Sequence, residues 1–275
     1  NWSTPFSGLK YSKLMAGRKV LILTEKELEF SPDETRMLFE DILDLWLEPE
    51  TLELVHQKTN GWAAGLILLY QSLKDKNQPK AAAEKIKGSN RLIHNYFDEN
   101  LFQDLPKPIQ NFLMKTAILP LLRADFCNAL LGIGNSRQIL SFLEDFHLFT
   151  FSQDEDRTIF FFHPLFRDFL QARLKICIPE DEISGLHNGA ALLYEKNDQG
   201  QEALKSHILA GNIADASRLL NILARPMIKQ GRPQIIKSLL SSVPEQYMDD
   251  EPWFQYLQAG YYCLCNQLNL AVQGY

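Results

Sequence analysis

Apolar residues along most of this chain recur every three or four positions, which is the spacing of one face of an α-helix. The stretch before residue 31 differs, because residues 20–23 form an unbroken apolar run. Such a run is typical of a strand buried on both faces, which normally belongs to a parallel sheet. Almost no other strand pattern follows it closely. We therefore expect residues 1–30 to be the end of a domain whose other strands lie upstream of this sequence.

Residues 31–105 have the pattern of a small helical bundle. A helix is expected to begin at Ser31, where a serine cap precedes Pro32 and two acidic residues of the first turn. Its buried stripe is predicted to contain Met37, Leu38, Ile42 and Leu45. Further helices are predicted over residues 49–59, 61–74 and 89–105. The last of them should turn Leu92, Ile93, Tyr96, Phe97 and Leu101 inward.

Residues 106–178 change to three short helices, ending near residues 117, 133 and 146, followed by two β-prone aromatic runs at 148–151 and 159–162. A charged turn between two such runs predicts a hairpin, and three helices with a hairpin make a winged helix. DNA reading by this domain is disfavoured. The candidate recognition helix, 136–146, contains one basic residue, Arg137, and two acidic residues, Glu144 and Asp145. A helix in the major groove needs basic and amide side chains instead.

Residues 179–275 alternate short amphipathic helices with small turns, which predicts stacked helical repeats resembling tetratricopeptide repeats. The helices are expected at residues 186–196, 201–210, 213–223, 233–242 and 253–265. Because the chain stops at Tyr275 inside a further helix, we expect a longer parent protein. The predicted fold is thus mainly α: a strand remnant, a helical bundle, a winged helix with a β-hairpin, and helical repeats.

Composition narrows the function classes. The net charge of −6 and a pI near 5.6 argue against a surface that grips nucleic-acid backbone. No apolar stretch approaches the ~20 residues that span a bilayer, so we expect no membrane contact and a cytoplasmic location. The four cysteines are scattered, without the paired spacing of zinc sites, and are interpreted as reduced core thiols.

Sequence motifs of catalysis are missing from the chain. It has no phosphate-binding loop of the G-x-x-x-x-G-K-[ST] type, no nucleophile elbow, no zinc-protease motif and no Gly-rich dinucleotide turn. The dispersed histidines offer no metal-ligand spacing. We therefore predict that this segment is not an enzyme and contains no catalytic or metal-binding residue.

Two segments are candidate sites. In Gly-Trp-Ala-Ala-Gly-Leu at residues 61–66, small residues at a helix start let another backbone approach closely, and the exposed amides could face an anion or nucleotide. Tight packing around a core tryptophan explains the same pattern. In His-Pro-Leu-Phe-Arg-Asp-Phe-Leu at residues 163–170, His163 at a strand-to-helix junction could donate a hydrogen bond to a phosphate. A partly buried histidine bonded to backbone is the alternative.

The order of these features resembles one family. The strand run, the Ser31 helix start, the two motif segments, the winged helix and the repeats together look like the MalT-type regulators, large LuxR-family members of the STAND signal-transducing ATPases. The resemblance covers essentially the whole chain. It implies an ATPase domain before this region, of which residues 1–30 are the end, and a DNA-binding domain after it. It divides the rest into a bundle at 31–105, a winged helix at 106–178 and truncated repeats at 179–275.

The resemblance also implies a switch and assigns site residues. His163 corresponds to the winged-helix histidine that holds the terminal phosphate of ADP in related proteins, and Gly61, Trp62 and Ala63 fall where relatives place a turn against adenine. ATP or ADP with Mg²⁺ is implied for the parent, and no cofactor for this segment alone. An unknown small-molecule or protein inducer is expected on the repeats, together with self-association of the parent and DNA contact only through its C-terminal domain.

Two other functions are compatible with the sequence. The helices and repeats could be an interaction module that binds a protein partner without any nucleotide. The same switch could also serve a different output, such as defence, because related ATPases have varied effector domains. The presence of a phosphate-binding loop in the parent would distinguish the switch from the interaction module. The domain that follows Tyr275 would distinguish a transcription regulator from a defence protein.

Overall fold

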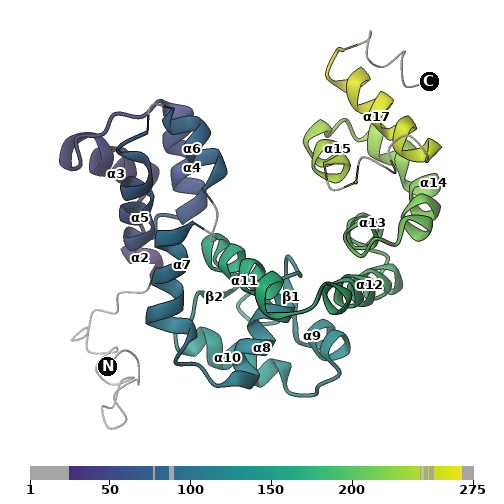
Figure 1. The fold of residues 1–275 in the computed structure, drawn as a ribbon, viewed down its shortest axis with the longest axis horizontal. Helices are drawn as coiled ribbons and strands as arrows, with labels where there is room; N and C mark the ends of the chain where they lie inside the picture. Colours follow the sequence, from purple (N-terminus) through teal and green to yellow (C-terminus); the bar gives the residue numbers. More distant parts are fainter. Residues whose placement is uncertain are drawn as a thin grey trace. The chain divides into compact units, whose positions relative to one another are not determined.

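The computed structural model describes residues 25–76, 78–86, 90–241, 243–244, 247 and 251–267. These residues are mainly helical, with one small sheet, as expected from the apolar spacing (Figure 1). The predicted strand at residues 20–23 lies outside the described residues. The chain divides into two compact units. The first runs to Cys127 and continues over Ile133–Leu174; the second comprises Asn128–Gly132 and the chain from Lys175 onward.

The first unit begins with the helical bundle. Its elements are α2 (Glu25–Leu28), α3 (Pro32–Met37), η1 (Leu38–Ile42), α4 (Pro49–Thr59), α5 (Ala63–Leu73), α6 (Pro79–Lys85), α7 (Arg91–Phe97) and η2 (Asp98–Phe102). The predicted start of α3 is confirmed. The Glu34 amide donates to Ser31 Oγ at 3.3 Å and the Ser31 amide donates to Glu34 Oε2 at 2.8 Å, which forms a capping box.

The predicted buried stripe of the first helix is wrong in part. Leu38 is buried, but Met37 is 58% exposed and Ile42 is 73% exposed. After Met37 the backbone changes from α-helix to the π-helix η1, whose hydrogen bonds join each residue to the fifth one along. This change rotates the following side chains out of the α-helical phase. Phe39 is fully buried in the core, although the α-helical spacing did not select it.

A second π-helix alters the last bundle helix. The predicted helix at residues 89–105 is α7 followed by η2. Of its predicted inner residues, Ile93 and Phe97 are fully buried, whereas Leu92 is 41% exposed. Phe102, on η2, is buried although the α-helical pattern did not select it. Phe97 and Phe102 are therefore the buried residues through which the bundle contacts the winged helix.

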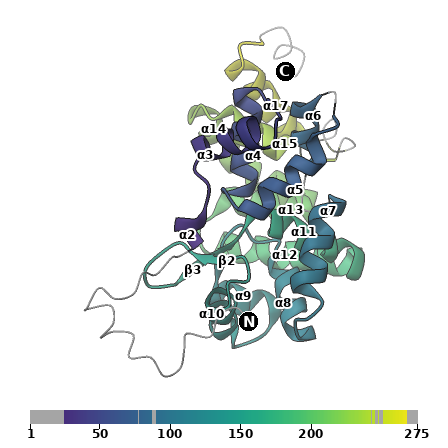
Figure 2. The same cartoon turned by 90° about the vertical axis from the view of Figure 1, so that its left-hand side faces the viewer.

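The winged helix lies mostly in the first unit, and only the ends of its second and last helices belong to the second unit. It comprises α8 (Lys107–Thr116), β1 (Leu122–Arg123), α9 (Ala124–Leu131), α10 (Ser136–Asp145), β2 (Thr150–Ser152), β3 (Ile159–Phe162) and α11 (Pro164–Cys177). The predicted hairpin is confirmed, with β2 antiparallel to β3 and Phe151 opposite Phe161 (Figure 2). β1 pairs with the other edge of β3, so the strand order is β1-β3-β2. The sequence did not predict β1, since two residues are too few for an alternating pattern.

An aromatic core joins the bundle to the winged helix. The ring of Phe97 lies 5.1 Å from that of Phe166 and 5.5 Å from that of Phe169, both on α11. The ring of Phe102 lies 5.5 Å from that of Phe169. All four side chains are almost completely buried. Because aromatic pairs contribute beyond the area they bury, these contacts hold α7 and η2 firmly against α11.

The second unit is a succession of helices that each pack on a neighbour. They are α12 (Glu180–Lys196), α13 (Gly200–Leu209), α14 (Ile213–Lys229), α15 (Pro233–Leu240) and α17 (Pro252–Leu264). The predicted helix at 213–223 is longer in the structure, because α14 continues through Pro226 to Lys229. Three helices are tied together at Glu195. Its carboxylate accepts from the buried His207 at 2.8 Å and from Arg218 at 2.8 Å.

The cysteines are free, but the prediction that all four are core thiols is wrong. Cys127 is buried, and that burial raises the pKa of its thiol to about 12. Cys177 and Cys263 are exposed and Cys265 is half-buried. Within the described part of the chain, no helix is long and apolar enough to cross a membrane.

Candidate functional site

The first candidate segment forms a tight turn between α4 and α5. Asn60 and Gly61 both adopt left-handed backbone conformations, with φ of 46° and 73°. The Trp62 amide donates to the Thr59 carbonyl at 2.9 Å, and the Phe30 amide donates to the Gly61 carbonyl at 2.9 Å. A Cβ at Gly61 would lie 2.2 Å from the carbonyl oxygen of Phe30. The expected close approach of another backbone to this glycine is therefore confirmed.

The second candidate segment places His163 between β3 and α11. Its backbone amide donates to the Phe149 carbonyl at 2.9 Å, continuing the hairpin by one bond. Its carbonyl accepts from the Arg167 amide at 2.9 Å, which is the first turn of α11. The side chain is only 3% exposed. The ring is therefore buried where the bundle meets the winged helix, and it is bonded to backbone as the alternative interpretation of this segment expects.

Both ring nitrogens of His163 are engaged. Nδ1 accepts a hydrogen bond from the Leu165 amide at 3.3 Å, so the side chain caps α11. Nε2 lies 2.8 Å from the Thr59 carbonyl oxygen and donates to it, because a carbonyl can only accept. This assigns the neutral Nε2–H tautomer. Burial lowers the pKa of His163 to about 4, and the bond to Thr59 opposes that shift only in part.

The two candidate segments meet at the Thr59 carbonyl. It accepts one bond from the Trp62 amide and one from His163 Nε2. The rings of Trp62 and His163 lie 5.7 Å apart in an edge-on arrangement. We call the group Thr59, Gly61, Trp62, Phe149 and His163 the clasp. It connects the α4–α5 turn of the bundle to the hairpin and α11 of the winged helix.

The indole of Trp62 is enclosed by other rings. It stacks on Phe97 with a centroid distance of 5.5 Å and an interplanar angle of 21°. Tyr96 and Phe149 meet it edge-on at 5.2 and 5.0 Å. Gly65 lies directly beneath it, where a Cβ would come within 2.5 Å of the indole. Packing against the tryptophan thus accounts for Gly65, and the approach of the Phe30 backbone accounts for Gly61.

The predicted site residues are only partly brought together. His163 and Trp62 are in contact, and Gly61 shapes the turn that carries Trp62. Ala63 is exposed at the start of α5. Sequence reasoning did not select Phe149, whose φ of 51° is unusual for a bulky residue and whose carbonyl anchors His163. The aromatic run at residues 148–151 was its only signal.

The arrangement of the clasp bears on the implied nucleotide. The single N–H of the His163 ring is directed at Thr59, and one face of the Trp62 indole is stacked on Phe97. In this arrangement the residues hold one another and present no open donor to a phosphate. Assignment of His163, Gly61, Trp62 and Ala63 to nucleotide binding therefore stays a prediction. In the described ranges no group of His, Cys, Asp and Glu could hold a metal ion.

Comparison with known proteins identifies the winged helix. The family described as MalT winged helix domain matches residues 98–182. The serine/threonine-protein kinase PknK of Mycobacterium tuberculosis H37Rv is 26% identical over 244 residues, which cover 89% of this chain and 22% of PknK. The HTH-type transcriptional regulator MalT of Yersinia pestis Pestoides F is 24% identical over 263 residues, which cover 94% of this chain and 29% of MalT.

A solved structure with a related description was also found. It is a STAND protein with a tetratricopeptide repeat sensor from Pyrococcus horikoshii, with a TM-score of 0.49 and 17% identity over 90% of this chain and 34% of that one. The chain spans less than a third of either curated relative. Residues 98–182 thus match the MalT winged helix domain, and the chain is similar to MalT over nearly its whole length.

Proposed function

We propose that this segment is the transducing part of an ATP-dependent LuxR-type transcription regulator in the cytoplasm. It couples an inducer bound on the helical repeats to exchange of ADP for ATP and to self-association of the parent. The segment itself performs no catalysis, and the parent contacts DNA through a separate domain. The similarity to a protein named as a transcriptional regulator supports this proposal.

The observation that carries the proposal is the clasp. One ring N–H of His163 joins the winged helix to the bundle, and it can serve only one acceptor at a time. His163 would release the Thr59 carbonyl when it donates to a phosphate oxygen of a nucleotide held by the ATPase domain. A change of acceptor at His163 would therefore break a hydrogen bond between the bundle and the winged helix. A ligand that favours one choice shifts the balance only by its differential affinity for the two forms.

Backbone strain at the clasp supports a switching role. Asn60 and Phe149, neither of them glycine, hold left-handed conformations on the two sides of the His163–Thr59 bond. For a bulky residue such as Phe149 this conformation costs roughly 1–3 kcal/mol, whereas Asn60 adopts it as a usual helix end after α4. In the proposed switch, release of the Thr59 bond would let the backbone at Phe149 relax.

A second output is favoured by a specific observation. One of the similar proteins is named as a kinase and another as a transcription regulator, and each matches this chain over most of its length. The same segment is therefore compatible with more than one effector domain in the parent. The remaining alternative, a protein-interaction module without nucleotide, predicts that the parent has no phosphate-binding loop. The sequence of the full gene distinguishes all three functions.

The experiment that tests the proposal uses the full-length parent with His163→Ala. Loss of a hydrogen bond to a charged phosphate should cost the ADP-bound form roughly 1.5–3 kcal/mol, which is about a ten- to hundredfold faster ADP release. Because His163 is buried, the variant is also expected to melt at a lower temperature. Melting alone therefore cannot decide, and a control with a similar loss of stability is needed.

Leu174→Ala is that control, since Leu174 is a buried core residue of α11 away from the clasp. It should lower the melting temperature and leave ADP release unchanged. Equal ADP release in both variants would remove His163 from the nucleotide site and leave it a structural residue of the junction.

A further inference from the structure

The negative charge of the chain is concentrated in one segment. Residues 25–53 contain eleven Asp and Glu against two Lys and Arg, which leaves 23 acidic and 26 basic residues elsewhere. This segment comprises α2, α3, η1 and the start of α4. Its field attracts a positively charged partner and repels nucleic acid and free phosphates.

The same segment exposes large apolar side chains. Met37 is 58% exposed, Ile42 73% and Trp46 70%. Single exposed apolar residues are ordinary, but an exposed tryptophan within a charged segment is not. Tryptophan combines a large apolar face with a ring quadrupole that attracts cations. The surface is therefore both acidic and apolar.

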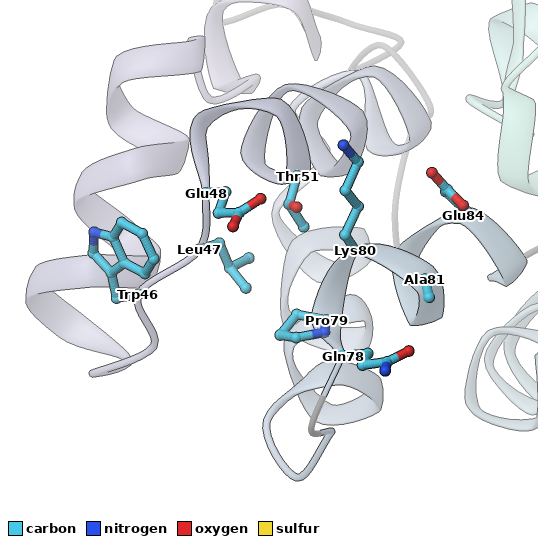
Figure 3. Close-up of a pocket in the computed structure, with 9 residues that line it drawn as sticks. All are labelled: Trp46, Leu47, Glu48, Thr51, Gln78, Pro79, Lys80, Ala81 and Glu84. Carbon is cyan, nitrogen blue, oxygen red and sulfur yellow. The ribbon is translucent and has the colours of Figure 1, made fainter.

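Trp46 borders a hollow of about 480 Å³ between the loop that precedes α4 and helix α6. We call it the Trp46 pocket. Figure 3 shows Trp46 at one end and Glu84 at the other, with Glu48 and Lys80 between them. The buried Thr51 also lines it, and Pro79 and Ala81 add an apolar wall. The pocket thus has an aromatic end, an apolar wall and carboxylates.

The carboxylates at the pocket outnumber the cations. Lys80 forms an ion pair with Glu50, which raises the pKa of Lys80 and lowers that of Glu50. Glu48 and Glu84 also lie close enough to raise the pKa of Lys80 by their charge. The Lys80 ammonium therefore faces three carboxylates, and a second ammonium, that of Lys58, lies 3.0 Å from the Glu84 backbone carbonyl oxygen. A second cation placed between Glu48 and Glu84 would be attracted by both.

We propose that the Trp46 pocket docks a Lys or Arg side chain of a partner protein, presented on an apolar segment. The charged head would lie between Glu48 and Glu84, and the aliphatic stem would cover Pro79 and the face of Trp46. A nucleotide or an acidic peptide is excluded as the occupant, because the same carboxylates repel it. This interaction is separate from the clasp and does not depend on the proposed nucleotide switch.

The test measures binding of a synthetic peptide to the full 275-residue chain by calorimetry. The probe is a dodecapeptide of repeated Leu-Lys-Gly, and its matched control is Leu-Glu-Gly. The lysine peptide should bind and the glutamate peptide should not. Trp46→Ala and the double variant Glu48→Gln with Glu84→Gln should each weaken binding about tenfold or more, while Trp46→Phe should weaken it less.

The control variant is Glu155→Gln with Asp156→Asn, which removes two exposed carboxylates from the hairpin turn. It should leave the affinity for the lysine peptide unchanged. An equal loss in this control would show diffuse charge attraction and would overturn the proposal, as would binding that survives Trp46→Ala. Circular dichroism of each variant confirms that the fold persists.

Two other occupants are separated by the same assay. Residues 1–24 contain four Lys and Arg and no acidic residue, so the assay also tests this basic segment as an occupant. If a variant lacking residues 1–24 bound the peptide at least tenfold more tightly, the occupant would be this segment and the proposal of a partner protein would be wrong. A Trp46-dependent dimer in sedimentation would likewise assign the surface to a second copy and contradict the proposal.

Discussion

His163 makes two structural contacts with one ring. Its Nδ1 caps α11 and its Nε2–H donates to the Thr59 carbonyl at the end of α4, and the ring is neutral and buried. Capping of α11 does not depend on the partner of Nε2. In the proposed switch, the ring would change acceptors at Nε2 and keep its position at the helix start.

The first prediction concerns acid sensitivity. The pKa of His163 is about 4 in the folded chain, below the value of 6.5 expected when unfolded, so the unfolded chain binds the extra proton. Stability is therefore complete above about pH 6.5 and is lost as the pH falls toward 4. From pH 7 to pH 5, His163 should account for a loss of about 2 kcal/mol.

Denaturant unfolding, followed by the fluorescence of Trp62 after replacement of the other three tryptophans by Phe, measures this loss. His163→Gln should reduce it by about 2 kcal/mol, because glutamine does not titrate. The variant of the exposed His147, His147→Gln, should leave it unchanged. An identical pH dependence in the two variants would show that His163 is not buried as the structure has it.

Gly61 gives a second prediction at this scale. Its φ of 73° is strained for any L side chain, and a Cβ would meet the Phe30 carbonyl at 2.2 Å. Gly132 has a φ of 66° with no atom near a Cβ. Both Gly→Ala changes incur the left-handed strain, but only Gly61→Ala adds a backbone clash of roughly 2 kcal/mol. Equal unfolding free energies for the two variants would contradict the close approach of Phe30.

At the scale of elements, apolar spacing predicted most helices and the hairpin but not the π-helices. α4 was expected at residues 49–59 and observed as Pro49–Thr59. Leu38–Ile42 and Asp98–Phe102 change the number of residues per turn without a distinctive composition. An α-helical pattern therefore misplaces Ile42 and misses Phe102, whereas Met37 and Leu92 lie on α-helical turns before the π-helices. β1 was missed because its partner, β3, lies far along the chain.

The winged helix shows why its fold does not imply DNA reading. Arg157 of the hairpin forms ion pairs with Glu144 and Asp145 at the end of α10. Arg137 of α10 donates to the Asp156 carbonyl at 3.4 Å. Both arginines are thus directed at the domain itself, and the carboxylates that Arg157 contacts would repel phosphates.

We therefore predict that the chain does not retard duplex DNA at physiological salt. Binding would need a cluster of Lys and Arg that neutralises several phosphates. A gel-shift titration at several salt concentrations measures this. A shift that weakens steeply with salt and is abolished by Arg137→Ala would contradict the prediction and restore α10 as a recognition helix.

At the scale of the molecule, the sequence located both halves of the clasp but not their contact. His163 and Thr59 are 104 residues apart, and no local pattern records that their atoms meet. The aromatic residues that enclose Trp62 come from α7 and the hairpin, and their spacing identifies only core positions. The hydrogen-bond partner of His163 depends on how the bundle packs on the winged helix. The spacing of residues along the chain does not predict this packing.

The central claim is that His163 exchanges the Thr59 carbonyl for a phosphate of ADP in the parent protein. Its most direct measurement is the dissociation rate of ADP from the full-length parent, compared between wild type, His163→Ala and Leu174→Ala. Release is expected to be about ten- to hundredfold faster for His163→Ala alone, with activity partly independent of inducer. Unchanged release from His163→Ala, with a melting temperature as low as that of Leu174→Ala, would contradict it.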